Sequence, residues 1–262
     1  GADCQVYLPP CLSAYVGADI TCGLLACDIL HARGPALLAD VGTNGEMALL
    51  SDGTIYCCAT AAGPAFEGVG ISCGSAAVTG AIDAVTVENN ALRCHVIGGG
   101  TARSLCGSGL LDAVAALRRL ELVEDSGYME DDSLPLSGSV SLLRRDIRSF
   151  QLAKAAVAAG IRVLLQQRGI TPEQVDGVYL AGGFGSYLDP ESAMTIGMLP
   201  RACAGRLHTL GNTALAGAAA LALAPAQWQR IGDISRACSY LELSGRADFA
   251  AAFTGNLSFP QP

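Results

Sequence analysis

Basic residues and aromatic residues are scarce in this sequence. Its 262 residues include 24 Asp and Glu against 16 Lys and Arg, which gives a formal net charge of -8, and aromatic side chains make up 5%. Nucleic-acid binding needs a basic face that neutralises phosphate groups, so the acidic balance argues against a nucleic-acid partner. The low aromatic content also argues against a binding surface built from aromatic side chains.

Long apolar runs are absent as well. The most apolar segment, ALAGAAALALA, is followed by Pro225 and is too short to span a bilayer, which takes about 18 or more such residues. We therefore expect no membrane partner. Because residue 1 is Gly and no basic stretch precedes the first apolar positions, we expect no signal peptide, a cytoplasmic location and a chain cut from a longer protein.

The eleven cysteines include no CxxC pair. Their odd number and scattered spacing indicate neither a disulfide framework nor a zinc or ferredoxin-type cluster site. We expect reduced and mostly buried thiols.

Hydrophobic residues make up 51% of the chain, which is enough to bury a substantial core. Residues 12–31 read as a helix, and residues 36–60 as a three-stranded meander. Its turns are expected at Asn44-Gly45 and Asp52-Gly53, because Asn and Asp tolerate, and Gly readily adopts, the positive φ of tight turns.

Strands and helices alternate after the meander. The predicted elements are strands at 81–87 and 94–99, a helix at 106–123, an acidic solvated loop at 124–132, a helix at 146–168, a strand at 175–183, a helix at 189–198, a strand at 206–212 and an Ala-rich helix from 213. Asp189, and either Asn212 or Thr213, are expected to cap helices. This order predicts an α/β layered domain.

Three junctions between a strand and a turn carry residues suited to a ligand site. They read DVGTNGE at 40–46, LAGGFGS at 180–186 and LGNTALAG at 210–217. Gly, Thr and Asn at a strand end leave backbone N–H groups and hydroxyls that could bind phosphate. Each turn alone is more often structural. Three together favour a shared nucleotide site, although neither GxxxxGK[ST] nor GxGxxG occurs.

Asp40 is unusual because it lies in the first apolar strand. A buried carboxylate is costly unless it is paired, hydrogen-bonded or near a cation. At the strand end Asp40 could face a magnesium ion through water, or it could cap Thr43 and the backbone of the turn. Glu46 and Glu67 are either carboxylates that orient water or ordinary surface positions.

Lys154 is the only lysine and falls in the apolar stripe of the helix predicted at 146–168. The apolar neighbours follow at three- and four-residue spacing, from Ile147 to Leu164. A lysine in such a stripe either extends its ammonium group past the edge of the core or meets an anion. Spacing alone favours the first.

Several segments resemble one protein family in order and spacing. They are LLADVGTNGEMAL, TAAGPAFEG, CGSGLLDAV, DIRSFQLAKAAVAAGI, YLAGGFGSYLDPESAMTIGMLP and LGNTALAGA. Over nearly its whole length the chain resembles the C-terminal domain of the reductive activators of corrinoid proteins. These belong to the ASKHA superfamily of sugar kinases, acetate kinase, actin and heat-shock chaperones, whose ribonuclease H-like lobes hold ATP between them.

The resemblance implies an α/β fold: a ribonuclease H-like lobe, in which a three-stranded meander is followed by alternating helices and strands, with an inserted α/β subdomain. The expected segments are a leading helix at 1–35, the first part of the lobe at 36–98, the insertion at 99–145, the second part with the adenosine motif at 146–224, and a C-terminal tail packing on the lobe at 225–262.

The resemblance also implies roles for individual residues. Those expected to bind ATP or ADP are Gly42, Thr43, Asn44, Gly45, Gln151, Lys154, Gly182, Gly183, Phe184 and Asn212. The first four are donors of a phosphate loop, and Gly182 to Phe184 match the adenosine motif. Asp40 is expected near magnesium, and Asp40, Glu46 and Glu67 are the catalytic candidates. Gln151 and Lys154 would contact ribose and adenine, so the family resemblance favours contact over an extended lysine.

In such activators, ATP drives electron transfer from an N-terminal two-iron ferredoxin-type domain to a cobalt(II) corrinoid, which restores cobalt(I) for methyl transfer. We therefore expect a corrinoid protein of a methyltransferase system as partner, and a homodimer. The first lobe and the ferredoxin-type cysteines are expected outside this chain. ATPase activity is then expected of the full-length protein and is weak or absent here, and no iron-sulfur cluster is expected within this chain.

Other functions stay open. The segment could be a non-enzymatic dimerisation or docking module that retains the fold, or part of a small-molecule kinase of the same superfamily. Another group of relatives, the activators of hydroxyacyl-CoA dehydratases, holds an iron-sulfur cluster between subunits. Cys106, at a helix start, is the nearest candidate for that role, although a lone cysteine is more often structural.

Overall fold

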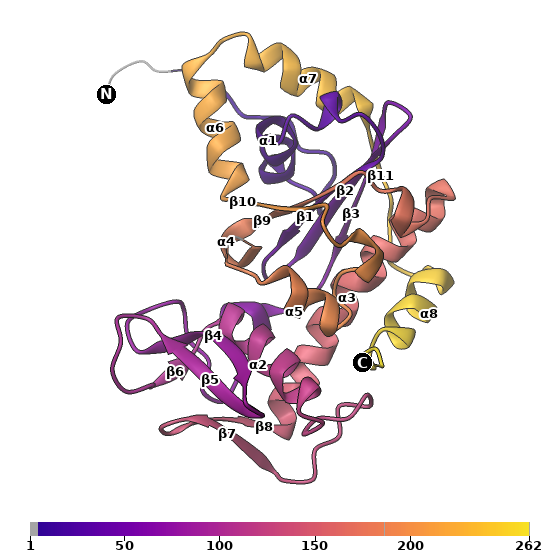
Figure 1. Cartoon of the computed structure of the whole chain (residues 1–262). Coiled ribbons are helices and arrows are strands. Elements are labelled where there is room, and N and C mark those ends of the chain that lie inside the picture. The colour runs from indigo at the N-terminus through magenta and orange to yellow at the C-terminus, as the bar shows by residue number, and fades with distance from the viewer. Residues whose placement is uncertain (1–4, 186, 262) are drawn as a thin grey trace.

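The chain folds around a six-stranded sheet. The computed structural model describes residues 5–185 and 187–261. The strand order is β10-β9-β1-β2-β3-β11 (Figure 1). The strands are β1 (Ala36–Val41), β2 (Gly45–Ser51), β3 (Thr54–Thr60), β9 (Gly177–Ala181), β10 (Leu207–Gly211) and β11 (Cys238–Tyr240). Neighbours within the β1–β2–β3 meander are antiparallel, whereas β9, β10 and β11 each join in parallel.

The central strands are apolar on both faces because helices cover both sides of the sheet. Along β1, Leu37 and Ala39 pack into one core cluster, while Ala36 and Leu38 pack into the other. This alternation is the two-residue period of a strand. Burial on both faces explains why β1 reads as a continuous apolar run.

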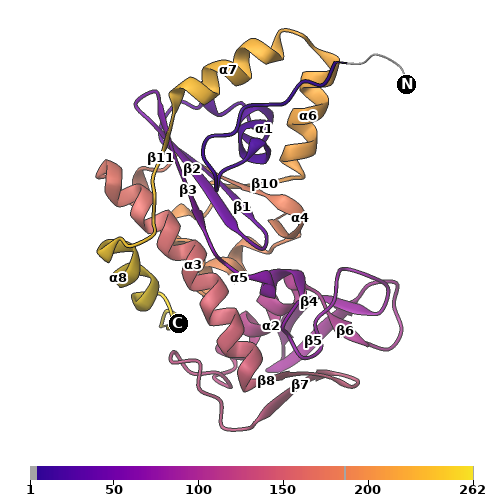
Figure 2. The same cartoon turned by 180° about the vertical axis from the view of Figure 1, so that it is seen from behind.

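Two groups of helices enclose the sheet (Figures 1 and 2). One face is covered by α1 (Ala18–Ala26), α6 (Thr213–Leu223) and α7 (Gln227–Ala237), and the other by α3 (Arg144–Arg168), against which α8 (Ala247–Gly255) packs. α1 and α6 approach closely, since a side chain on Gly217 would overlap the backbone of Cys22. Only a residue without Cβ fits at this crossing.

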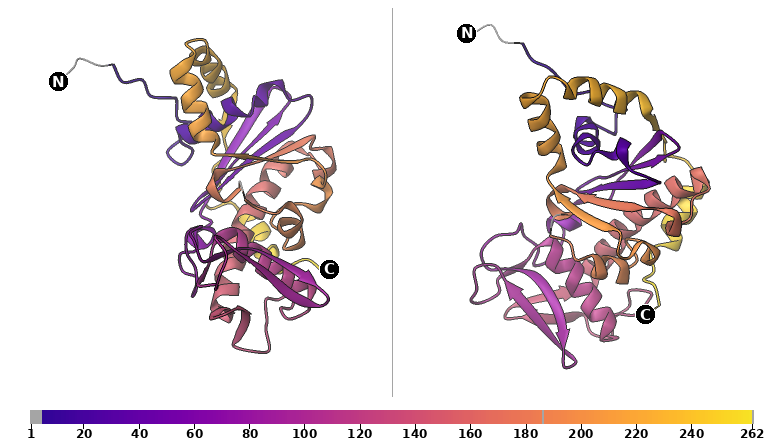
Figure 3. Two further views of the ribbon diagram at one scale, coloured as in Figure 1. Left: turned by 60° about the vertical axis from the view of Figure 1, so that its left-hand side comes forward. Right: turned by 45° about the horizontal axis from the view of Figure 1, so that its top comes forward.

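A smaller α/β unit lies beside the central sheet, on the side away from α6 and α7 (Figure 3). It contains the sheet β5-β4-β6, the hairpin β7-β8 and helix α2. Its elements are β4 (Ala81–Glu88), β5 (Ala91–Val96), β6 (Ser104–Leu105), α2 (Gly107–Arg119), β7 (Ser133–Ser137) and β8 (Val140–Leu143). Leu110, Val114 and Leu117 recur at helical spacing on α2 and are all buried.

Short helices connect the larger elements. They are η1 (Ile29–His31), η2 (Pro64–Glu67), η3 (Pro172–Gln174), α4 (Gly182–Gly185), α5 (Pro190–Thr195) and η4 (Arg201–Cys203). The predicted caps are confirmed: the side chain of Asp189 accepts from the N–H of Ser192, and that of Asn212, rather than Thr213, accepts from the N–H of Leu215, both at 2.9 Å.

Two predicted helix boundaries were wrong. The helix expected at 12–31 is only α1, which ends before Asp28; this residue has a φ of 53°, and η1 follows it. The helix expected to reach Met198 ends at Thr195, because Gly197 has a φ of 72° and leaves the helical conformation.

The two hairpin turns of the meander differ in backbone conformation. Asp52 and Gly53 have φ values of 51° and 75°, as predicted for such a turn. The positive φ predicted at Asn44-Gly45 was wrong, since neither residue has one. Gly45 is required for space instead, because a Cβ there would lie 2.8 Å from Oγ1 of Thr60.

The predicted fold class is confirmed: a meander followed by alternating helices and strands, with an inserted α/β unit. In the part of the chain that the structure describes, no helix combines the length and apolarity needed to cross a bilayer. The ten cysteines in that part are free thiols, of which five are buried and Cys11 is exposed.

Candidate functional site

The register of the parallel strands brings the three predicted junctions to one edge of the sheet. Asp40 on β1 lies beside Ala181 on β9, so the turn after β1 and the glycines after β9 emerge together. Gly211 on β10 also pairs with Ala181. The carboxyl ends of parallel strands are the usual place for ligand sites in α/β sheets.

A pocket of about 310 Å³ opens at this edge. The predicted site residues that line it are Asp40, Gly42, Glu67, Gly182, Gly183 and Phe184. Another wall is made by Ser75, Ala76 and Ala77, which precede β4, and by Cys106, Gly107 and Ser108 at the start of α2 in the inserted unit. The volume lies at the lower end of the ~300–1,000 Å³ range of small-molecule sites.

The turn after β1 is held by Glu67. Its Oε1 accepts hydrogen bonds from the hydroxyl of Thr43 at 2.7 Å and from the N–H of Thr43 at 3.1 Å. The N–H of Gly63 donates to the carbonyl of Thr43 at 2.8 Å. The sequence left open whether Glu67 orients water or is an ordinary surface residue. The structure shows that Glu67 is exposed and that its two bonds to Thr43 hold the shape of the turn.

Asp40 and Glu46 pair across β1 and β2. Burial, together with the carboxylate of Asp19 at the start of α1, raises the pKa of Asp40 to about 6 and that of Glu46 to about 7. Neither Asp40 nor Glu46 belongs to an ion pair within the described residues. Raised pKa values of this kind mark carboxylates that a cation would stabilise.

Phe66 and Phe184 form the aromatic wall of the pocket. Their rings stack with centroids 4.7 Å apart at an interplanar angle of 19°. Glycines allow this packing: a Cβ on Gly107 would overlap the carbonyl oxygen of Phe66 and lie 3.1 Å from the Phe184 ring. Gly182 has a φ of 88°, and a Cβ there would overlap Oδ1 of Asp40.

Several predicted residues do not line this pocket. Asn44 lines a different cavity, of about 810 Å³, together with Tyr15 and Tyr240. Gly45 is buried in β2. The side chain of Asn212 caps α6. Thr43 adjoins the pocket through its bond to Glu67, and Glu46 adjoins it through its strand partner Asp40. The junction at 210–217 and the second half of the junction at 40–46 therefore support the pocket without lining it.

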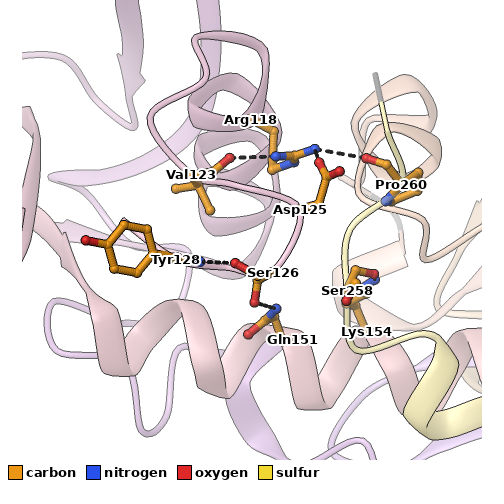
Figure 4. Close-up of polar contacts among 9 residues, drawn as sticks. All are labelled: Arg118, Val123, Asp125, Ser126, Tyr128, Gln151, Lys154, Ser258 and Pro260. Atoms are coloured by element: carbon orange, nitrogen blue, oxygen red, sulfur yellow. Dashed lines mark hydrogen bonds and ion pairs between the residues drawn. The ribbon is translucent and has the colours of Figure 1, made fainter. Parts of the chain in front are cut away.

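Gln151 and Lys154 lie on α3 and contact the C-terminal segment (Figure 4). The extension of the Lys154 ammonium past the core edge, which spacing alone favoured and the resemblance did not, is wrong, since this side chain is 1% exposed. Nζ of Lys154 donates to the carbonyl of Ser258 at 2.6 Å. Nε2 of Gln151 donates to the carbonyls of Ser126 and Leu257 at 2.9 and 3.0 Å. Their contact with ribose or adenine stays a prediction, because neither lines the pocket.

The match to known families covers most of the chain. A family model described as the C-terminal domain of RACo, the ASKHA domain, matches residues 34–262. This chain belongs to that family. The matched range contains the turn after β1, the inserted unit and the glycines after β9, so the pocket is built wholly from residues of the RACo C-terminal domain.

Two curated proteins are similar to this RACo-type domain over most of its length. The corrinoid activation enzyme RamQ of Eubacterium limosum is 31% identical over 278 residues, which cover 95% of this chain and 46% of that protein. The [Co(II) methylated amine-specific corrinoid protein] reductase of Methanosarcina barkeri is 30% identical over 257 residues, which cover 90% of this chain and 47% of that protein. The chain therefore spans about half the length of these relatives.

A solved structure shares the fold closely. The protein named reductive activator for corrinoid,iron-sulfur protein superposes with a TM-score of 0.89 at 32% identity, covering 97% of this chain and 44% of that chain. The similarity extends beyond the sheet to nearly the whole RACo-type domain.

The donor set of the RACo-type pocket allows one kind of metal binding. In residues 5–185 and 187–261, no three His, Cys, Asp or Glu side chains converge as direct ligands of a metal ion. A divalent cation near Asp40 would be held through water and the oxygens of a bound ligand, as magnesium prefers. Asp40 and Glu46 fit such an ion, because both have raised pKa values and neither forms an ion pair with a side chain that the structure describes.

Asp19, Ser108 and Tyr187 are site residues that the sequence did not reveal. Ser108 and Tyr187 line the pocket, and Asp19 acts on the pKa of Asp40. An acidic residue in the first turn of a helix is ordinary, because it complements the helix dipole. The sequence around Asp19 therefore gave no indication that this residue acts on the site. The CGSG segment that contains Ser108 indicated only the start of a helix.

Proposed function

We propose that this chain is the nucleotide-binding lobe of an ATP-dependent reductive activator of a corrinoid protein, which restores cobalt(I) for methyl transfer. The observation that carries the proposal is the pocket in which Asp40 and Gly42 meet Gly182, Gly183 and Phe184. The names of the relatives, corrinoid activation enzyme and corrinoid protein reductase, support the reaction.

Each part of the pocket has a role in the proposal. Gly42, the residue of the turn at 42–45 that lines the pocket, lies against the phosphates of ATP or ADP, and Thr43, Asn44 and Gly45 support the turn behind it. Gly182, Gly183 and Phe184 lie against the adenosine. Asp40 holds magnesium through water, and the ion neutralises phosphate charge. Glu67 keeps Thr43 in place by accepting its two hydrogen bonds.

Of the catalytic candidates Asp40 and Glu46, Glu46 has the pKa better suited to accepting a proton from water, although it adjoins the pocket only through its cross-strand partner Asp40. A carboxylate with a pKa of about 7 is suited to general-base work near neutral pH, and burial together with Asp19 and Asp40 provides that pKa. Glu67 is already bonded to Thr43. We expect hydrolysis by this chain alone to be weak or absent, because it spans under half of each relative.

The remaining parts of the activator lie outside this chain in the proposal. The two-iron cluster belongs to an N-terminal domain, and the electron acceptor is a corrinoid protein of a methyltransferase system. A homodimer and a cytoplasmic location complete the proposal. Sedimentation equilibrium of the chain checks the homodimer.

Isothermal titration of the chain with ATP and with ADP, in the presence of Mg²⁺, tests the proposal. Asp40→Ala should weaken binding by about tenfold, equivalent to about 1.4 kcal/mol. The control is Asp131→Asn, an exposed carboxylate outside the pocket, which should leave the affinity unchanged. If neither this chain nor the full-length protein that contains it binds nucleotide, the proposal fails.

Binding to a corrinoid protein, measured with and without nucleotide, separates the proposal from the docking-module alternative. A docking module would bind a corrinoid protein equally well with and without nucleotide. In the full-length protein, loss of the Asp40 carboxylate should abolish the ATP-dependent reduction of a cobalt(II) corrinoid, which is followed by its visible absorption.

A further inference from the structure

The C-terminal segment 257–261 is tied to the body of the molecule by buried polar side chains (Figure 4). Arg118 on α2 and Gln151 and Lys154 on α3 are 7%, 3% and 1% exposed. Each donates to a backbone carbonyl of the segment: Arg118 to Pro260 at 2.9 Å, Gln151 to Leu257 and Lys154 to Ser258. Three side chains from two helices therefore bond successive parts of one short segment.

The segment also bonds the loop after α2. The N–H of Phe259 donates to the carbonyl of Asp125 at 2.8 Å. Arg118 donates to the carbonyl of Val123 at 2.6 Å and pairs with the carboxylate of Asp125. The acceptor of the buried Lys154 ammonium, the carbonyl of Ser258, belongs to this segment, and a buried charge without a partner is among the costlier defects in a protein interior. The segment thus satisfies buried polar side chains, although Phe259 alone among its five residues is buried.

Phe259 connects this segment to the core by aromatic contacts. The ring is 4% exposed. Nζ of Lys154 and Cζ of Arg118 lie 5.0 and 5.6 Å from its centroid, a cation–π arrangement on both counts. The ring of Phe150, on α3, lies next, with centroids 6.4 Å apart.

The aromatic contacts of Phe259 and Phe150 continue to the pocket. Phe150 meets Phe66 edge to face, with centroids 5.8 Å apart, and Phe66 stacks on Phe184. We name Phe259, Phe150, Phe66 and Phe184 the aromatic row. Phe66 and Phe184 line the pocket, and Gly107 packs directly against both of them.

We propose that segment 257–261 positions the aromatic wall of the pocket, with Phe259 holding Phe150 and, through it, the Phe66–Phe184 stack. Interiors are close-packed, so removing one ring shifts its neighbours. Phe259, Arg118 and Lys154 are positioning residues, since they lie outside the pocket and act through other side chains. The part of this inference that concerns nucleotide affinity rests on the proposed function.

The test uses the whole chain with Phe259→Ala, and Phe253→Ala as the matched control. Phe253 is a partly buried aromatic on α8 that pairs with Phe249 and lies outside the aromatic row. We expect Phe259→Ala to weaken Mg²⁺–ATP binding by roughly three- to thirtyfold, the usual size of a coupling between linked sites. Phe253→Ala should change it by less than about twofold. Phe259→Leu, which retains an apolar side chain, should restore part of the affinity.

Hydrogen–deuterium exchange without nucleotide separates this inference from the proposed function. In Phe259→Ala, peptides that contain Phe66 and Phe184 should exchange at least about threefold faster than in Phe253→Ala. If neither the wild-type chain nor the full-length protein that contains it binds nucleotide, the proposed function fails, and this exchange still decides the inference. Unchanged exchange in those peptides overturns it. If Phe259→Ala does not fold, Phe259→Leu is compared with Phe253→Ala in the same way.

Discussion

Asp40 and Glu46 are cross-strand partners that both carry raised pKa values. Their unfolded pKa values are near 4, so between about pH 4 and pH 7 the folded chain binds more protons than the unfolded chain. The free energy of unfolding must therefore fall as the pH rises through this window. At neutral pH, burying the two carboxylates lowers the free energy of unfolding, and a bound cation would offset this cost.

The first prediction concerns this cost. Asp40→Asn and Glu46→Gln should each raise the free energy of unfolding at pH 8 by about 1 kcal/mol, a figure discounted for solvent screening of half-buried groups. Neither should change it below pH 4, where both carboxyls are protonated. Urea unfolding at pH 4 and pH 8 measures the difference, with Asp131→Asn as the exposed control. Equal shifts at both pH values would contradict the prediction.

The second prediction compares two neighbouring glycines. Gly182→Ala should destabilise the chain by about 2 kcal/mol or more, because it combines a positive φ with overlap of the Asp40 carboxylate. Gly183→Ala meets no atom within 4 Å and should leave thermal stability nearly unchanged. If Gly183 lies against a bound nucleotide, Gly183→Ala should still weaken Mg²⁺–ATP binding. Thermal melts and titrations of the two variants check both statements.

The third prediction concerns Lys154. Lys154→Ala should cost about 3 kcal/mol, because it opens a cavity and leaves the carbonyl of Ser258 without its donor. Lys154→Met keeps the volume and removes the buried charge, so its cost should be under about 1.5 kcal/mol. Urea unfolding at pH 7 measures both. Equal costs would contradict the prediction, because they would show that loss of the charge and its bond, and not loss of volume, decides the effect.

Lys154 also gives a pH dependence of opposite sign to that of Asp40. Burial, with the neighbouring Arg118 charge, lowers the Lys154 pKa to about 8, while the unfolded value stays near 10.5. Stability from this group is present above pH 10.5 and is lost as the pH falls towards 8. Relative to Lys154→Met, the wild-type chain should gain stability between pH 8 and pH 10. A constant difference across that range would exclude the lowered pKa.

The fourth prediction concerns the bond that shapes the turn after β1. Glu67→Ala removes the acceptor for the hydroxyl and N–H of Thr43. Because both residues are exposed, stability should fall by only about 0.5–1 kcal/mol. Nucleotide binding should weaken more strongly, since the turn loses its shape. Glu67→Gln retains the acceptor oxygen and serves as the control that separates hydrogen bonding from charge.

Local pattern predicted most of the fold. The apolar runs of β1, β2 and β3, the Asp52-Gly53 turn and the Asp189 cap all depend on neighbouring residues, so the sequence reveals them. Residues 12–17 continue the apolar pattern of α1 but are not helical. The hydroxyl of Ser13 accepts hydrogen bonds from the N–H groups of Tyr15 and Val16, and such side-chain bonds compete with a helix.

The site was predictable only in part, for a similar reason. Turns suited to ligand binding are rich in Gly, Thr and Asn, and this composition identified Gly42 and Gly182 as site residues. The partner of Lys154 could not be found, because Ser258 is far away in sequence and offers only a backbone carbonyl, which every residue possesses. Asp19 escaped since its effect on Asp40 arises from folding alone.

The pairing of β1 has a consequence for the order of synthesis. One edge of β1 pairs with β2, which follows it within a few residues. The other edge pairs with β9, where Gly177 lies opposite Ala36, so this edge cannot pair until β9 has been synthesised. At the usual pace of translation the ribosome needs roughly 7–28 s to make the intervening chain. During that time an apolar strand edge at the heart of the future sheet stays open to other chains. We expect the newborn protein to depend on chaperones more than its finished fold suggests.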